Sequence, residues 1–248
     1  MRFLHVSLFS FLSILFIPAF CMANDDNADA WTYDDDTTGQ EDWGAIAGYE
    51  TCGSGMEQSP INISYTKLSN LPELDFQYGK VDGALHITKQ SFIMKIAKSG
   101  TLFDGKNKYT LQSVEIHSPS GHRVRDEFHP MEIHLIHKNS KGELLIVAVF
   151  ADIGAANEPI NDILKQPISK NRTKQFTTDL SSLINNTESY YSYIGSLPYP
   201  PCTENVQWRI IKTPISISKG QLSSIVSYIG RNTRLSQPVY MREVLEGN

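Results

Sequence analysis

Two short segments of the chain each carry a glutamate and, two residues later, a histidine. The first pair is Glu115 and His117, and the second is Glu132 and His134. On a β-strand, side chains two residues apart point to the same face, so each segment presents a carboxylate and an imidazole together. Two neighbouring strands of this kind would place Glu115, His117 and His134 around one metal ion, because both groups are zinc ligands.

The spacing alone leaves a second interpretation open, which is a polar sheet face with hydrogen-bonded core histidines. Five of the seven histidines nevertheless lie between residues 117 and 137, so this is the densest functional signal in the sequence. We expect the other three of them, His122, His129 and His137, to lie outside the set of metal ligands.

The elements that must position these residues are short strands separated by turns. Apolar and polar residues alternate over residues 84–96, 113–117 and 131–137, which predicts strands with one buried face. The continuous apolar run 144–150 predicts a strand buried on both faces. The run 104–107, Asp-Gly-Lys-Asn, predicts a tight turn between two strands.

Helical signals are few. Short helices are predicted over residues 160–164, 178–184 and 222–229. Ser218 is placed to cap the last of these, with Gln221 in the reciprocal position three residues on. No internal repeat or linker interrupts the chain, so the sequence predicts one mostly-β domain with short surface helices.

The overall composition fits one globular domain. A chain of 248 residues can bury one large core, and its net charge of −5 is mild. This charge argues against a nucleic-acid partner and gives no support for binding an anionic membrane surface.

Residues 1–23 read as a signal peptide. Arg2 is basic, residues 4–20 are almost wholly apolar, and Cys21-Met22-Ala23 offers a cleavage pattern. A membrane anchor and a lipid-modified Cys21 are the alternatives. With cleavage no membrane span remains, and we expect a periplasmic or secreted protein.

Residues 24–42 form an acidic, exposed arm in this interpretation, and residues 43–248 form the domain. Cleavage also removes Cys21 and leaves Cys52 and Cys202. An even cysteine count in an exported protein suggests one disulfide, with two free buried thiols as the alternative.

Beyond the histidine segment, several motifs follow in a recognisable order. They are Trp31-x-Tyr33, Trp43, Cys52, Gln58-Ser59-Pro60-Ile61, Gly195-Ser196-Leu197, Pro200-Pro201-Cys202, Val206-x-Trp208, Lys212-x-Pro214-Ile215-Ser216 and Asn232-x-Arg234-x-x-Gln237-Pro238. Over residues 31–242 the chain resembles the α-class carbonic anhydrases, and especially their catalytically impaired relatives. The resemblance implies a single domain built on a large twisted, mainly antiparallel sheet, with a zinc ion held by three histidines. Cys52 and Cys202 stand where exported bacterial members carry a disulfide.

Carried over by position, the resemblance places His117 and His134 at the second and third zinc histidines. Glu115 stands in place of the first, and Ser113 replaces the glutamine that would hold that histidine. Glu132 matches the carboxylate that orients the third histidine, which is a common partner for a metal-bound imidazole.

The catalytic positions depart further. Pro198 replaces the threonine that orients the zinc-bound hydroxide, and Tyr199 replaces the threonine beside it. Gly121 stands at the glutamate that holds the first of these threonines, and Phe92 at the proton-shuttle histidine. The apolar wall of the family's cleft is matched by Ile136, Ile146, Leu197 and Trp208.

These departures favour an exported protein of this fold with absent or strongly impaired carbon dioxide hydration. It would act as a binding or interaction module for a small molecule or for a protein or glycan partner. The alternative is a zinc metalloenzyme, functional or altered, that uses Glu115, His117 and His134; zinc is therefore the candidate cofactor. The sequence gives no indication of the oligomeric state.

Overall fold

The computed structural model describes residues 31–34, 37–88, 90–98, 100–165 and 173–247. The predicted signal peptide, 1–23, lies outside the described residues, as does the first part of the predicted acidic arm. Among the described residues, no helix is both long and apolar enough to cross a lipid bilayer.

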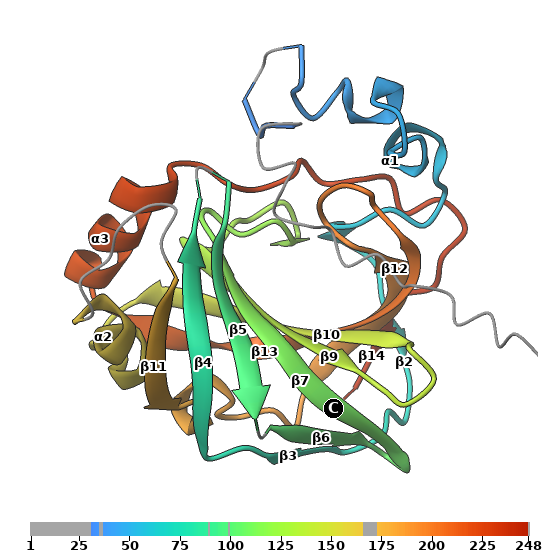
Figure 1. Cartoon of the computed structure of the whole chain (residues 1–248). Helices are drawn as coiled ribbons and strands as arrows, with labels where there is room; N and C mark the ends of the chain where they lie inside the picture. Colours follow the sequence, from blue (N-terminus) through green and yellow to red (C-terminus); the bar gives the residue numbers. More distant parts are fainter. Residues whose placement is uncertain (1–30, 35–36, 89, 99, 166–172, 248) are drawn as a thin grey trace, which may run out of the picture.

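A twisted sheet of 12 strands dominates the fold (Figure 1). Its strands run in the order β11-β4-β5-β7-β9-β10-β13-β12-β14-β2, while β6 pairs with β3 and β7. All pairings in this sheet are antiparallel except β10 with β13 and β14 with β2. A separate parallel pair joins β1 and β8. The predicted mostly-β fold with a mainly antiparallel sheet is confirmed.

The strand bounds are β1 (Asn62–Ile63), β2 (Lys67–Leu68), β3 (Leu74–Gln77), β4 (Lys80–Ile87), β5 (Phe92–Lys98), β6 (Thr101–Asp104), β7 (Asn107–His117), β8 (Arg123–Val124), β9 (Met131–Lys138), β10 (Leu144–Ile153), β11 (Lys174–Asp179), β12 (Tyr190–Ser196), β13 (Glu204–Ile217) and β14 (Leu245–Glu246). The turn after Asp104 and the buried apolar strand are present. Strands also lie at 113–117 and 131–137, but both are buried on both faces, and the run 84–96 is divided between β4 and β5.

The helices are short: η2 (Trp43–Ala45), α1 (Thr51–Ser54), α2 (Glu158–Leu164), η3 (Ser181–Leu183) and α3 (Lys219–Ile229). α2 and α3 confirm two of the predicted helices, and Ser218 with Gln221 forms the predicted capping box. The helix predicted over residues 178–184 is wrong. Residues 174–179 pair with β4 instead, and only the 3-10 helix η3 follows.

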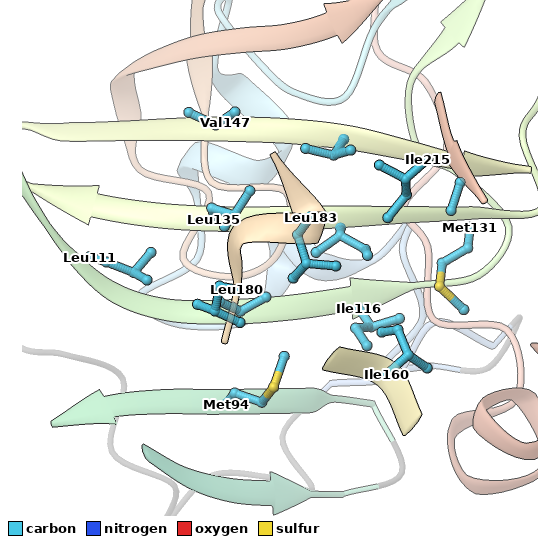
Figure 2. Packing of buried hydrophobic residues seen from close by; sticks show 14 of the residues in the cluster. Met94, Leu111, Ile116, Met131, Leu135, Val147, Ile160, Leu180, Leu183 and Ile215 are labelled. Atoms are coloured by element: carbon cyan, nitrogen blue, oxygen red, sulfur yellow. The ribbon is translucent and has the colours of Figure 1, made fainter. Parts of the chain in front are cut away.

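The two faces of the central strands bury different clusters. The larger cluster lies on the face covered by α2, α3 and η3, and Figure 2 shows part of it, including Leu135 and Val147 of the sheet with Ile160 of α2 and Leu183 of η3. The opposite face carries a smaller cluster around Trp208. Because successive side chains alternate between the faces, Glu115, His117 and His134 share this second face.

The amino-terminal segment is fixed by aromatic contacts and a disulfide. The rings of Tyr33 and Trp43 lie 5.1 Å from that of Trp31 in edge-on geometry. The predicted disulfide between Cys52 and Cys202 is present, with the two Cα atoms 5.0 Å apart. It joins α1 to the loop after β12, which carries Pro198 and Tyr199.

Candidate metal centre

The register of β7 against β9 brings the predicted metal ligands together. Glu115 lies directly opposite His134, and His117 lies opposite Glu132. The imidazole rings of His117 and His134 are 4.3 Å apart between centroids. The two Glu-x-His segments therefore meet on one face of the sheet, as their spacing predicts.

His117 has one ring nitrogen held and one without a partner. Nδ1 lies 3.0 Å from the backbone oxygen of Asn232. Since a carbonyl only accepts, Nδ1 carries the proton. Nε2 is buried and has no hydrogen-bond partner. Burial, with the neighbouring His134, lowers the pKa of His117 to about 3, so the ring is neutral and Nε2 keeps a lone pair.

His134 has the complementary arrangement. Its Nε2 lies 2.9 Å from Glu132 Oε1, while its Nδ1 is buried without a partner. Burial alone would raise the pKa of Glu132, but His122 and His134 and their hydrogen bonds hold it well below its ordinary value. Glu132 is therefore an anion that fixes the ring of His134 with Nδ1 free to accept.

Glu132 accepts four hydrogen bonds in all. The other three come from the backbone N–H groups of Gly121 and His122 and from the ring Nδ1 of His122. His122 Nε2 in turn meets the hydroxyl of Tyr193 at 2.7 Å. His122, which the sequence placed outside the site, thus belongs to the network that orients His134.

Within the part of the chain that the structure describes, one set of three metal-ligating side chains has its ligand atoms within 4.8 Å of one another. It comprises His122, Glu132 and His134. Their proximity follows from the hydrogen bonds just described, which occupy both oxygens of Glu132. A metal between these three groups would have to displace those protons, so we interpret the set as an orienting network.

Glu115 does not complete a set with the two imidazoles. Its Oε1 accepts hydrogen bonds from Tyr199 at 3.2 Å and from Ser113 at 3.3 Å. Burial raises the pKa of Glu115 to about 7, against the opposing effects of these two hydroxyls and of the Lys95 charge. The carboxylate is turned toward hydroxyl partners on its own strand and on the loop after β12.

The residues present therefore match the family's zinc site only in part. The two unpartnered nitrogens, on His117 and His134, are unusual, since buried polar atoms normally have partners, and they suit a metal. The third donor is not in place, because Glu115 with these imidazoles does not form a set within 4.8 Å among the described residues. The geometry is that of a two-imidazole half-site.

The loop that carries Pro198 and Tyr199 is held at both ends. The N–H of Leu197 donates to the backbone oxygen of Thr203, and the N–H of Cys202 donates to that of Tyr199. Pro198 is buried and offers neither a hydroxyl nor an N–H, so it cannot orient a nearby water through either group.

Gly121 leaves no room for a carboxylate side chain. A Cβ built there would lie 2.9 Å from Cγ of Pro60 and 3.3 Å from the methyl group of Thr233. Its N–H is already used by Glu132. The departures at 121 and 198 are both compatible with close local packing.

The four residues predicted to form an apolar wall lie together in one cluster. Ile146 pairs in register with Ile136 and Trp208 on the strands to either side, and Leu197 packs against the same cluster. Phe92 lies in the larger cluster on the opposite face and is almost fully buried. The side chain of Phe92 therefore offers no group that could carry protons.

The remaining two histidines of the segment lie away from the two imidazoles. His129 bonds Asp152 at 2.8 Å and stacks on Phe150. His137 belongs to the opposite face, where its Nδ1 donates to the backbone oxygen of Leu145 and its Nε2 meets the hydroxyl of Tyr78.

Comparison with known proteins agrees with this fold. The family model for eukaryotic-type carbonic anhydrase matches residues 38–247. The chain belongs to the carbonic anhydrase family, as the motifs predicted.

Individual relatives match over nearly their whole length. A carbonic anhydrase from Klebsiella pneumoniae is 34% identical over 228 residues, covering 88% of this chain and 92% of the relative. The solved structure of the Photobacterium profundum alpha-carbonic anhydrase has a TM-score of 0.81 at 30% identity, covering 87% and 99%. A dioscorin structure, complexed with ascorbate, has a TM-score of 0.82 at 28% identity, covering 87% and 97%.

Proposed function

We propose that this member of the carbonic anhydrase family has absent or strongly impaired carbon dioxide hydration and acts as a binding module. The observation that carries the proposal is the hydrogen bond between Tyr199 and Glu115. It bonds one carboxylate oxygen of Glu115, the residue at the first ligand position, to the loop after β12, and among the described residues Glu115 does not form a close set with His117 and His134.

The chemistry of the family explains why the position of the Glu115 carboxylate matters for hydration. When bound, zinc lowers the pKa of its water to about 7 and so supplies hydroxide at neutral pH. The protein must hold the metal firmly and orient the hydroxide. Here the third donor is engaged elsewhere, and Pro198 and Gly121 provide no hydroxyl–carboxylate pair to orient a nucleophile.

A stopped-flow assay of carbon dioxide hydration tests the proposal. The purified protein, with its disulfide intact, is incubated with equimolar zinc and compared with an active α-carbonic anhydrase under the same conditions. We expect a rate indistinguishable from the uncatalysed reaction. A rate clearly above background that a sulfonamide abolishes would end this interpretation.

A small organic molecule is the first candidate ligand for the sheet face that carries Glu115 and Trp208. On that face Ile136, Ile146 and Trp208 belong to one buried apolar cluster, while Glu115 and Tyr199 supply polar groups, and small-molecule sites commonly combine apolar walls with a few polar groups. Because a dioscorin of the same fold has been solved with ascorbate, ascorbate is a reasonable first probe. Calorimetric titration with ascorbate, repeated on Tyr199→Phe, tests whether this face binds it. A protein or glycan partner remains the other possibility.

The alternative function is that of an altered metalloenzyme. The unpartnered nitrogens of His117 and His134 favour it specifically, because they are buried, neutral and close together. Metal analysis after mild dialysis separates the two functions. Less than a stoichiometric amount of zinc or iron would exclude the metalloenzyme.

We also propose that the protein is exported to the periplasm or secreted. The disulfide between Cys52 and Cys202 supports this, because such bonds persist in oxidising compartments. Sequencing the amino terminus of the protein recovered outside the cytoplasm would test the cleavage predicted after Ala23.

A further inference from the structure

Next to the two imidazoles lies a carboxylate that is close in register and has one oxygen bonded to other groups. Glu115 lies directly opposite His134 across the β7–β9 ladder, where side chains on one face are neighbours. Its carboxyl group nevertheless does not join His117 and His134 within 4.8 Å in the described part of the chain. Other groups in the fold engage this carboxylate.

Two hydroxyl groups do so, and both act on the same oxygen. Ser113 and Tyr199 donate to Glu115 Oε1. Ser113 comes from the same strand, two residues earlier, whereas Tyr199 comes from the loop that the disulfide at Cys202 anchors. The direction of the carboxylate therefore depends in part on a residue 84 positions away in the chain.

The two imidazoles, in contrast, are already aimed. His117 is held through Asn232 and His134 through Glu132, and each is left with one free nitrogen. A metal site of two imidazoles and one carboxylate needs only the third donor to move into place. The two imidazoles are thus fixed by their own hydrogen bonds, independently of the bonds that hold the Glu115 carboxylate.

We propose that Tyr199 is a lock on a latent metal site: its hydroxyl holds Glu115 away from His117 and His134, so that the native protein offers a divalent metal only two ligands. Removing that hydroxyl releases the carboxylate and creates a three-ligand site. Tyr199 is a positioning residue in this scheme and need not touch the metal. The inference concerns the same site as the proposed function but is tested by metal affinity and not by turnover.

The test measures binding of cobalt(II) to the metal-free protein by calorimetry and by its visible absorption. We expect Tyr199→Phe to bind cobalt at least about 10-fold more tightly than the native protein, which is the scale of effects seen for groups that orient metal ligands. The absorption should also change, because a third protein ligand alters the coordination of cobalt.

Three further variants distinguish the lock from a general effect of losing a tyrosine hydroxyl. Tyr65→Phe removes the hydroxyl of a tyrosine that is 90% exposed, and it should leave cobalt affinity unchanged. The double variant Glu115→Gln with Tyr199→Phe should lose the gain, because the gain requires the carboxylate. Ser113→Ala removes the other hydroxyl donor and should give a smaller gain, which keeps the test available if Tyr199→Phe folds poorly.

The outcomes are distinct. Unchanged or weaker cobalt binding in both Tyr199→Phe and Ser113→Ala would overturn the lock, and weaker binding would mean that these hydroxyls support a bound carboxylate. A gain that persists in the double variant would overturn it as well. The proposed function is tested by carbon dioxide hydration by the native protein, and the lock by the cobalt affinity of the variants, so failure of the lock and failure of the proposed function are seen in separate measurements.

Discussion

Glu132 and His134 are joined by a hydrogen bond of 2.9 Å that fixes which nitrogen of the imidazole is free. The same carboxylate also accepts from the ring of His122 and from two backbone N–H groups. One buried anion therefore sets the direction of a candidate ligand and closes the turn around Gly121.

We expect Glu132→Ala to lower the free energy of unfolding by about 3–5 kcal/mol, since it leaves several buried donors without an acceptor. Urea denaturation monitored by tryptophan fluorescence measures this. The matched control is Glu73→Ala, because the Glu73 side chain is exposed, and its effect should stay within about 0.5 kcal/mol. A similar, small loss in both variants would contradict the role given to Glu132.

Gly121 and Gly220 should respond oppositely to alanine. At Gly121 the new Cβ meets Pro60 at 2.9 Å, so Gly121→Ala should destabilise the protein by about 1–3 kcal/mol. Gly220 is exposed in α3, and its Cβ would meet only Ser218 Oγ at 3.8 Å. Gly220→Ala should therefore stabilise by about 0.5–1 kcal/mol. Thermal unfolding of the two variants checks the signs, and a stable Gly121→Ala would show that this position has room for a side chain.

Much of the site's placement could be predicted because it depends on local alternation. The spacing in Glu115-x-His117 and Glu132-x-His134 was enough to put these side chains on shared faces, and the cap at Ser218 was predicted from its own segment. The direction of Glu115 could not be predicted, since it depends on Tyr199, a residue far along the chain. The motif around Tyr199 predicted the loop after β12 but not the hydrogen bond from Tyr199 to Glu115.

Other errors have the same physical origin. Residues 178–184 look helical locally, yet the edge of the sheet recruits residues 174–179 through pairing with β4. His122 seemed peripheral because its partners, Glu132 and Tyr193, lie on two different strands. Tertiary hydrogen bonds of this kind leave no periodic signal in the sequence.

The protein should lose stability in mild acid through His137. Burial lowers the pKa of His137 to about 4, whereas in the unfolded chain it is about 6.5. The unfolded state therefore binds the proton first as the pH falls. The contribution of His137 to the free energy of unfolding is fully present above about pH 6.5. It is lost as the pH falls toward 4, at up to about 1.4 kcal/mol per pH unit.

His117 in the metal-free protein contributes in the same direction, because burial lowers its pKa to about 3. Glu115 contributes in the opposite direction between about pH 7 and pH 4.5, because burial raises its pKa to about 7. Urea denaturation of the metal-free protein between pH 7 and pH 4 measures the combined slope. His137→Gln should reduce the slope although it also lowers stability at pH 7. An unchanged slope in this variant would show that His137 is not titrating as described.

Restoring a histidine at position 115 should repair metal binding without repairing catalysis. In Glu115→His the third donor becomes an imidazole, so we expect tighter zinc binding, by roughly 10-fold or more. Hydration should remain near background, since Pro198 still lacks a hydroxyl and Gly121 a carboxylate. Zinc affinity and stopped-flow hydration are measured on the same sample. Full activity from this single change would show that the pair at 121 and 198 matters less than we argue.

The central claim is that Glu115 is held by Tyr199 and does not act as a metal ligand in the native protein. Crystals equilibrated with zinc and measured at the zinc absorption edge test it most directly. We expect Glu115 to remain bonded to Tyr199. Any zinc on the sheet face of His117 and His134 should be partly occupied and bound by these two histidines alone. A fully occupied tetrahedral zinc held by Glu115, His117, His134 and one ordered water would contradict the account.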